Sequence, residues 1–449
     1  MFSRFCLRAG LLVVALSTIA SVSASTQPAK KEKEPAMGQF AVKQIRHIVT
    51  QFPGRMAGSD VEIQASSYLQ IMFANMGYTV SAIPFRVLYP YVSKTGSKPA
   101  EQSIDATDTG SVTSNPSPQS ATQQKASEQP TKSALKQQAA QSNAVSQNHA
   151  TKADQATETA NNKAIAKWHQ AEQAKQPGDS KPEPKHTVTK WYQTIATTVV
   201  ASKEGKSPKK IIVMAHFDSY APLSDEDTEK HLGGPTLQGV DDNASGVGVM
   251  LELAERMKNI PTKYSLSFVA SSAEELKALG AKNYLNHMTQ QQRDDIVLMI
   301  NLDSLITGEN LYFHSGRTTP PEVAHKSRDR ALALAKELGI EATTNPGSEK
   351  YPRGTGCCSD YKTFDEANIP VMAVEATNWS LGERNGYQQR TISPSFPEGV
   401  TWHRPHYDNL EYLETHLPGQ LERRTREVVQ ILLPLLKELA EAEPTAQNH

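Results

Sequence analysis

Cysteine is scarce in this chain, with three residues in 449. Cys6 lies near the amino terminus, and Cys357 and Cys358 are adjacent to each other. A bond between neighbouring cysteines closes only a small strained ring, and two free thiols are the alternative to it. No disulfide framework can therefore hold the fold together, and a hydrophobic core has to do so.

Charge excess and long apolar segments are also lacking. The formal net charge is −1, and no dense basic cluster lies outside the segment of residues 93–184 discussed below. This balance argues against nucleic acid as a partner. Beyond the first 24 residues, no stretch approaches the roughly 20 apolar residues that cross a bilayer, so we expect no stable membrane insertion.

The amino terminus has the features of a secretory signal peptide. Arg4 and Arg8 precede an apolar run over residues 9–22, and the small-residue pattern Val-Ser-Ala follows at residues 22–24. Such a pattern predicts cleavage after about Ala24 and export to the periplasm or the medium. The alternative is a membrane anchor, but the run is short for a membrane span.

Composition changes abruptly over residues 93–184. Ser, Thr, Gln, Ala, Lys, Asn and Pro dominate this segment, and large apolar residues are almost absent. Such a stretch buries too little surface to offset its ordering entropy. We therefore interpret it as a disordered insertion in a surface loop, which divides one peptidase-like domain into residues 25–92 and residues 185–449.

On both sides of the insertion, strand-like and helix-like patterns alternate. Strands are predicted at YTVSAIPF, WYQTIATTVVAS, KIIVMAHFDS, YSLSFVAS, DDIVLMINLDS and IPVMAVEA. Helices are predicted after Ser59 or Asp60, in GVMLELAERM, from Glu274 onward, near SRDRALALAKELG and over residues 420–440. This alternation favours an α/β fold, a three-layer α/β/α sandwich around a mostly parallel sheet.

Polar residues follow several of these strands, at the sheet edge where ligands of such folds bind. They are His216, Asp218, Glu274, Glu275 and Asp303, and a Gly-flanked turn just before a helix adds Asp241 and Asp242. Each has an ordinary explanation taken alone: a loop histidine, a helix cap, or acids that complement a helix dipole. Gathered at one rim, however, these acids would repel one another without added positive charge.

Divalent cations would supply that charge. Carboxylates mixed with imidazole suit zinc, and a carboxylate that bridges two ions suits a two-metal hydrolase. A second histidine ligand should then come from WHRPHYDN, which offers His403 and His406.

Five segments, in chain order, resemble the motifs of the co-catalytic zinc aminopeptidase family, which includes glutamate carboxypeptidase and the transferrin receptor ectodomain. They are AHFDS, GVDDNASG, SSAEEL, INLDS and WHRPHYDN. The further segments TLQGVDDNASG, TNPG, GTGCC and VEATNW resemble one bacterial branch, the isozyme-conversion aminopeptidases. The resemblance covers nearly all of the chain apart from the leader and the insertion, and it implies two zinc ions per chain.

Matching motif to motif implies a role for each residue of the rim. Asp242 matches the bridging ligand; His216 and Asp303 match the remaining ligands of one zinc, and Glu275 and His403 those of the other. Glu274 matches the general base, and Asp218 an acceptor that orients the His216 imidazole.

Two points depart from the family pattern. The family usually shows a histidine with an aspartate four residues further on. Here Asp408 follows His403 by five residues and His406 by two. We favour His403 as the ligand because of the adjoining Trp402 and the resemblance to the isozyme-conversion branch. The residue that stabilises the oxyanion stays open between Tyr361 and Tyr351. Asp241 is expected to orient its turn.

The function implied is removal of single residues from the amino termini of peptides or proteins. The branch resemblance further implies a preference for amino-terminal arginine, with Glu375 as an acidic candidate by position. A glutaminyl cyclase with a single zinc and a catalytically inactive binding module are the alternatives.

Overall fold

The computed structural model describes residues 35–94, 187–344, 359–377 and 393–443. All of these except Pro35 belong to one compact unit, Ala36–His449. The predicted signal peptide, nearly all of the insertion, Tyr351, Cys357 and Cys358 lie outside the described residues. Ser93 and Lys94, which the insertion was expected to include, instead end a strand.

The strands form one sheet in the order β1-β2-β4-β3-β5-β8-β6-β7. Their bounds are β1 Thr79–Lys94, β2 Thr187–Lys203, β3 Ser207–His216, β4 Tyr264–Ser271, β5 Ile296–Leu302, β6 Asn310–Ser315, β7 Ala342–Thr343 and β8 Val371–Thr377. Each strand expected from the sequence is present, and β1 and β2 run longer than their patterns indicated.

Parallel pairing is confined mainly to the centre of the sheet. Strands β4, β3, β5 and β8 are parallel neighbours, as continuous apolar runs predict for strands covered on both faces. Toward the edges, β1 with β2, β2 with β4 and β6 with β8 are antiparallel. The expected parallel sheet thus holds for its core, and antiparallel pairings extend it on both sides.

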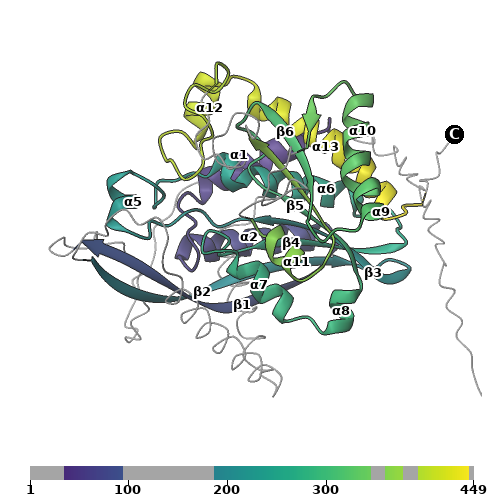
Figure 1. Ribbon diagram of the computed structural model, residues 1–449, viewed down its shortest axis with the longest axis horizontal. Coiled ribbons are helices and arrows are strands. Elements are labelled where there is room, and N and C mark those ends of the chain that lie inside the picture. Colours follow the sequence, from purple (N-terminus) through teal and green to yellow (C-terminus); the bar gives the residue numbers. More distant parts are fainter. Residues whose placement is uncertain (1–34, 95–186, 345–358, 378–392, 444–449) are drawn as a thin grey trace, which may run out of the picture. The chain divides into compact units, whose positions relative to one another are not determined.

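Helices flank the sheet on both faces (Figure 1). Their bounds are α1 Gln39–Gln51, α2 Asp60–Asn75, α5 Asp225–Glu229, α6 Gly246–Met257, α7 Leu279–Asn286, α8 Gln290–Asp294, α9 Pro321–Ala324, α10 Arg330–Glu337, α11 Tyr361–Glu366, α12 Leu410–His416 and α13 Gln420–Leu439. The segment η2 (His325–Asp329) is a π-helical turn, and η1 (Val240–Ser245) is a kinked turn in which Asp242 and Asn243 depart from helical backbone angles. Within the described ranges, no helix has the length and apolarity that crossing a bilayer requires.

Alternate side chains of the central strands enter two separate cores. On β3, Val213 packs in a large core with α1, α2, α6 and α13, whereas Met214 packs in a smaller core with α7 and α11. On β4, Phe268 and Val269 divide in the same way. The period of two along the strands places one helical layer on each face, which confirms the three-layer sandwich.

The helix expected from Glu274 begins later, at Leu279. Between β4 and α7 the chain turns irregularly, and Ala273, Lys277 and Ala278 adopt left-handed backbone conformations. Left-handed residues cannot continue a right-handed helix, so the two glutamates lie on a loop and not on a first helical turn. That loop presents their side chains at the end of the strand.

Candidate metal centre

The acids and histidines expected at the sheet edge do lie together there. His216 is the last residue of β3, and Asp303 directly follows β5. Glu275 is in the loop after β4, and Asp242 is in η1 just before α6. Because these central strands are parallel, their carboxyl ends share one edge, and residues distant in sequence meet there.

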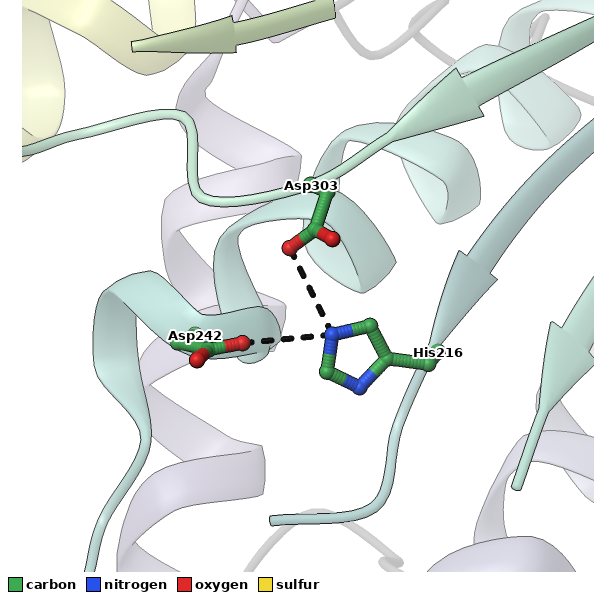
Figure 2. Close-up of side chains that lie close together, drawn as sticks. All are labelled: His216, Asp242 and Asp303. Atoms are coloured by element: carbon green, nitrogen blue, oxygen red, sulfur yellow. Dashed lines mark ion pairs between the residues drawn. The ribbon is translucent and has the colours of Figure 1, made fainter. Parts of the chain in front are cut away.

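One cluster consists of His216, Asp242 and Asp303 (Figure 2). The Nε2 atom of His216 lies 3.2 Å from Asp242 Oδ1 and 3.4 Å from Asp303 Oδ1. Figure 2 shows both carboxylates directed at the same imidazole nitrogen from two different elements. The three ligand-type atoms therefore surround one common point.

A second cluster uses the other oxygen of Asp242. His403 Nε2 lies 3.2 Å from Asp242 Oδ2 and 3.0 Å from Glu275 Oε2. His406, the alternative histidine, is exposed, and its ring packs near that of His231. The geometry thus brings His403 and not His406 to the carboxylates, and Asp242 joins the two clusters.

The two clusters fit zinc ions. Four ligands at zinc distances of about 2.0–2.1 Å, arranged tetrahedrally, lie about 3.3 Å from one another. The four separations in these clusters fall between 3.0 and 3.4 Å. In addition, Glu275 Oε1 is buried without a hydrogen-bond partner among the described residues. Both the spacing and the mixed nitrogen and oxygen donors suit zinc.

Electrostatics in the centre also call for positive charge. Burial alone would lower the pKa of His216, but Asp303, Asp218 and Asp242 outweigh it and raise that pKa well above its usual value. Burial raises the pKa of Glu274 well above its ordinary range, and it raises the pKa of Glu275 to about 7. These pKa values are raised because several carboxylates lie close together with little access to solvent. Divalent cations would supply the positive charge that such a cluster requires.

Asp218 orients the centre somewhat differently from the expectation. The Nδ1 atom of His216 lies 3.2 Å from the backbone oxygen of Asp218 and 3.6 Å from its carboxylate. The carboxylate instead accepts hydrogen bonds from the backbone N–H groups of Glu274 (3.1 Å) and Glu275 (3.3 Å). Asp218 thus fixes the imidazole through its main chain and the glutamate loop through its side chain.

Asp241 and Asp408 hold the turn that carries Asp242. The Asp241 carboxylate accepts hydrogen bonds from the N–H groups of Ile306 and Thr307, consistent with its expected orienting role. Asp408 accepts from the N–H groups of Asp241 (2.7 Å) and Asp242 (3.2 Å). In the sequence, the only signal for Asp408 was its spacing from His403 and His406 in WHRPHYDN.

Arg55, a buried arginine near the centre, was not predicted from the sequence. Arg55 is fully buried and donates to the carbonyls of Phe217 (2.6 Å), Gln238 (2.5 Å) and Gly239 (2.8 Å). Those carbonyls flank the segments that carry His216 and Asp242. Burial lowers the Arg55 pKa to about 10, which still leaves the side chain charged at neutral pH. Arg55 ties the two segments together and brings positive charge beneath the acids.

Residues 359–360 complete the surroundings of Asp303. Asn301 Nδ2 donates to Ser359 Oγ (2.9 Å), which in turn donates to Asp303 Oδ2 (2.6 Å). This leaves Asp303 Oδ1 directed at His216. Asp360 accepts a hydrogen bond from Ser271, and burial raises the Asp360 pKa to about 7. Neither residue was singled out from the sequence, although both directly follow the segment GTGCC.

Two further candidates, Tyr361 and Glu375, come from α11 and β8. Tyr361, proposed for the oxyanion, begins α11 and packs in the smaller hydrophobic core. Glu375 lies on β8, and its Oε1 is 2.6 Å from Nε2 of His314. It follows Val374, whose carbonyl accepts from the N–H of Asp303, so it lies at the same rim.

Two His and carboxylate clusters that share one aspartate, at the carboxyl edge of a three-layer sandwich, have the donor set of a metal-dependent hydrolase, a class that includes aminopeptidases. The model of Peptidase family M28 matches residues 198–429. The chain is 40% identical to the alkaline phosphatase isozyme conversion protein of Escherichia coli (strain K12), over 98% of this chain and 100% of that protein. The chain belongs to peptidase family M28, which confirms the expected family and the enzyme class of metallo-aminopeptidase.

Solved structures share the fold at low sequence identity. A zinc aminopeptidase from Bacillus subtilis matches with a TM-score of 0.54 and 16% identity, covering 91% of this chain and 96% of that chain. A glutaminyl cyclase from an Acidobacteriales bacterium matches with a TM-score of 0.50 and 13% identity, covering 92% of this chain and 99% of that one. These likenesses support the α/β/α architecture.

Proposed function

We propose that this chain is an exported aminopeptidase that uses two zinc ions to hydrolyse the first peptide bond of peptides or proteins. The observation that supports this most directly is the shared carboxylate. Asp242 offers Oδ1 to the His216 cluster and Oδ2 to the His403 cluster, so one side chain can serve two metal ions. Under this proposal His216, Asp242 and Asp303 hold one ion, and Asp242, Glu275 and His403 hold the other.

Zinc held there would lower the pKa of the attacking water toward about 7, polarise the scissile carbonyl, and receive the free α-amino group of the substrate. Glu274 then acts as the general base: it takes a proton from the water and passes it to the leaving amine. Its neighbour Glu275 is turned to His403, and the N–H groups of both glutamates are held by Asp218. Adjacent glutamates thereby serve different roles.

Glu274→Gln is the variant that tests the base. It keeps the size of the side chain and removes its proton affinity, so we expect two bound zinc ions and a loss of kcat of at least about 100-fold. Glu275→Gln is the matched variant, and it should lose zinc as well as turnover. Zinc content is measured by inductively coupled plasma mass spectrometry. Turnover is measured by the hydrolysis of fluorogenic aminoacyl substrates. Full turnover by Glu274→Gln would remove Glu274 from the mechanism.

Arginine is proposed as the favoured amino-terminal residue, on the resemblance to the isozyme-conversion branch. Glu375 supports it as an acid at the same rim as Asp303. Glu375→Gln should lower kcat/KM for an arginyl substrate more than for a leucyl substrate. Equal losses on both substrates would remove Glu375 as a specificity residue.

The cyclase alternative predicts a different product from the same site. Glutaminyl peptides incubated with the enzyme should lose their amino-terminal residue under our proposal, and they should instead cyclise without release under the alternative.

Export is tested separately by the amino terminus of protein recovered from the periplasm. We expect that terminus at Ser25, and an intact Met1 would contradict a cleaved leader.

A further inference from the structure

The two histidines of the centre are held in different ways. His216 is almost completely buried, and the backbone oxygen of Asp218 lies 3.2 Å from its Nδ1. His403 is about a quarter exposed, and no described residue hydrogen-bonds to its Nδ1. Ligand histidines usually have their second nitrogen held by an acceptor, which fixes the ring orientation. Among the described residues, an aromatic contact holds the ring of His403 instead.

Tyr220 makes that contact. Its ring stacks on the His403 imidazole with centroids 4.2 Å apart and an angle of 11° between the planes. A near-parallel ring at this distance blocks rotation of the imidazole about its χ2 torsion on one side. The carboxylates of Asp242 and Glu275 lie within 3.2 Å of Nε2, at the edge of the same ring.

The stacked pair is clamped by the loop that follows Tyr220. The N–H of Gly233 donates to the carbonyl of His403 (2.7 Å), and the N–H of Gly234 donates to the carbonyl of Tyr220 (3.0 Å). A Cβ atom at Gly233 would lie 2.7 Å from the Tyr220 ring, so this close approach requires glycine. His403 itself has a φ of 60°, an unusual conformation that these contacts help to hold.

The tyrosine hydroxyl extends the clamp to helix α5. It donates to Asp227 Oδ2 at 3.2 Å, and the same oxygen accepts from the N–H of Leu223 at 2.8 Å. The ring of Tyr220 is therefore fixed at its backbone by Gly234 and at its hydroxyl by Asp227. This anchoring gives the ring a defined position against the imidazole.

We infer that Tyr220 is a positioning residue for the metal site formed by Asp242, Glu275 and His403, in which stacking of the tyrosine ring fixes the orientation of the ligand imidazole. The inference rests on the proposed zinc site, but it concerns one of the two ions. Loss of the ring should weaken binding of the ion at His403, whereas binding of the ion at His216 should be unaffected. The hydroxyl should matter less than the ring.

Zinc affinity at each site tests this inference. The protein is stripped of metal and titrated with zinc in competition with a chromophoric chelator, which resolves two binding steps. Tyr220→Leu should weaken one step by about 10- to 100-fold, the usual effect of losing a residue that orients a ligand, and leave the other unchanged. Tyr220→Phe keeps the ring and should bind zinc nearly as the unaltered protein does.

Tyr412→Leu is the matched control, because Tyr412 also stacks on an imidazole, that of His416 (centroids 4.6 Å apart, 18° between the planes), and His416 is not a candidate ligand. Both of its zinc steps should be unchanged. Equal zinc binding by Tyr220→Leu and the unaltered protein would overturn the role of Tyr220 while leaving the proposed function intact. Weakening of both steps would show a general structural effect and also overturn it. Failure of the unaltered protein to bind two zinc ions would overturn the proposed function itself.

Discussion

Glu62 offers a quantitative test of the electrostatics beneath the sheet edge. It lies on α2, is fully buried, and accepts a hydrogen bond from the N–H of Thr197 on β2 (3.1 Å). Its second carboxylate oxygen has no partner among the described residues. Burial raises the pKa of Glu62 to about 8 from an ordinary 4.5. The folded protein therefore holds a proton here that the unfolded chain releases above pH 4.5.

The sign and size of the effect follow from linkage. Each pKa unit corresponds to about 1.36 kcal/mol, so the rise from 4.5 to about 8 is worth about 5 kcal/mol in all. The contribution is fully present below pH 4.5, falls as the pH rises, and is lost above about pH 8. Between pH 5 and pH 8, the free energy of unfolding should fall by about 3.5 kcal/mol through this group.

Glu62→Gln isolates that contribution, because glutamine has nearly the same shape and does not titrate. Other groups titrate alike in both proteins, so their effects cancel in the difference. Urea unfolding at pH 5, 6, 7 and 8 should show the variant gaining stability on the unaltered protein as the pH rises. Ser66→Ala, a buried change on the same helix, should give a difference that is independent of pH. Parallel pH profiles for Glu62→Gln and the unaltered protein would refute the reasoning.

Four further results are expected, all measured by urea or thermal unfolding. Arg55→Met leaves three buried carbonyls without their donor and should cost about 3 kcal/mol or more; a loss under 1 kcal/mol would contradict the tie it makes. Phe268→Ala should cost about 3–5 kcal/mol through the cavity it leaves between β4 and α2. Ser59→Ala removes the cap that accepts from the N–H of Glu62 and should cost about 1 kcal/mol, whereas Ser59→Asp should cost little. Zinc at 100 times its dissociation constant should add about 2.7 kcal/mol over the chelated protein, and an unchanged melting temperature would count against a native-state zinc site.

The central strands could be predicted from the sequence because a strand that is buried on both faces is a continuous run of apolar residues. The run from Ile211 to Ala215 is apolar at each position, and the structure buries each of them. The helix expected from Glu274 was wrong for a local reason. Glutamate, leucine and alanine favour helix in isolation, but the left-handed residues Ala273, Lys277 and Ala278 prevent it, and none of them is a glycine that would have signalled the turn.

Some residues of the site could be predicted from the sequence and others could not. Residues directly after a strand, such as His216 and Asp303, could be placed at one rim because parallel strands end at a common edge. Tyr220 could not, because a ring stacked on a residue far along the chain follows no periodic pattern. Arg55 was hidden for the opposite reason: an isolated arginine looks like a surface residue, and only the fold buries it.

Charge balance explains why Arg55 belongs inside this protein. The acids around the centre include Asp218, Asp242 and Asp408, and all three stabilise the charged form of Arg55. Arg55 donates its hydrogen bonds to carbonyls, however, and not to these carboxylates. It therefore lends positive potential to the acids while their oxygens stay available to imidazoles, backbone N–H groups and metal ions. A direct ion pair would have consumed those oxygens, and a neutral residue would have left the acids to repel one another before a metal arrived.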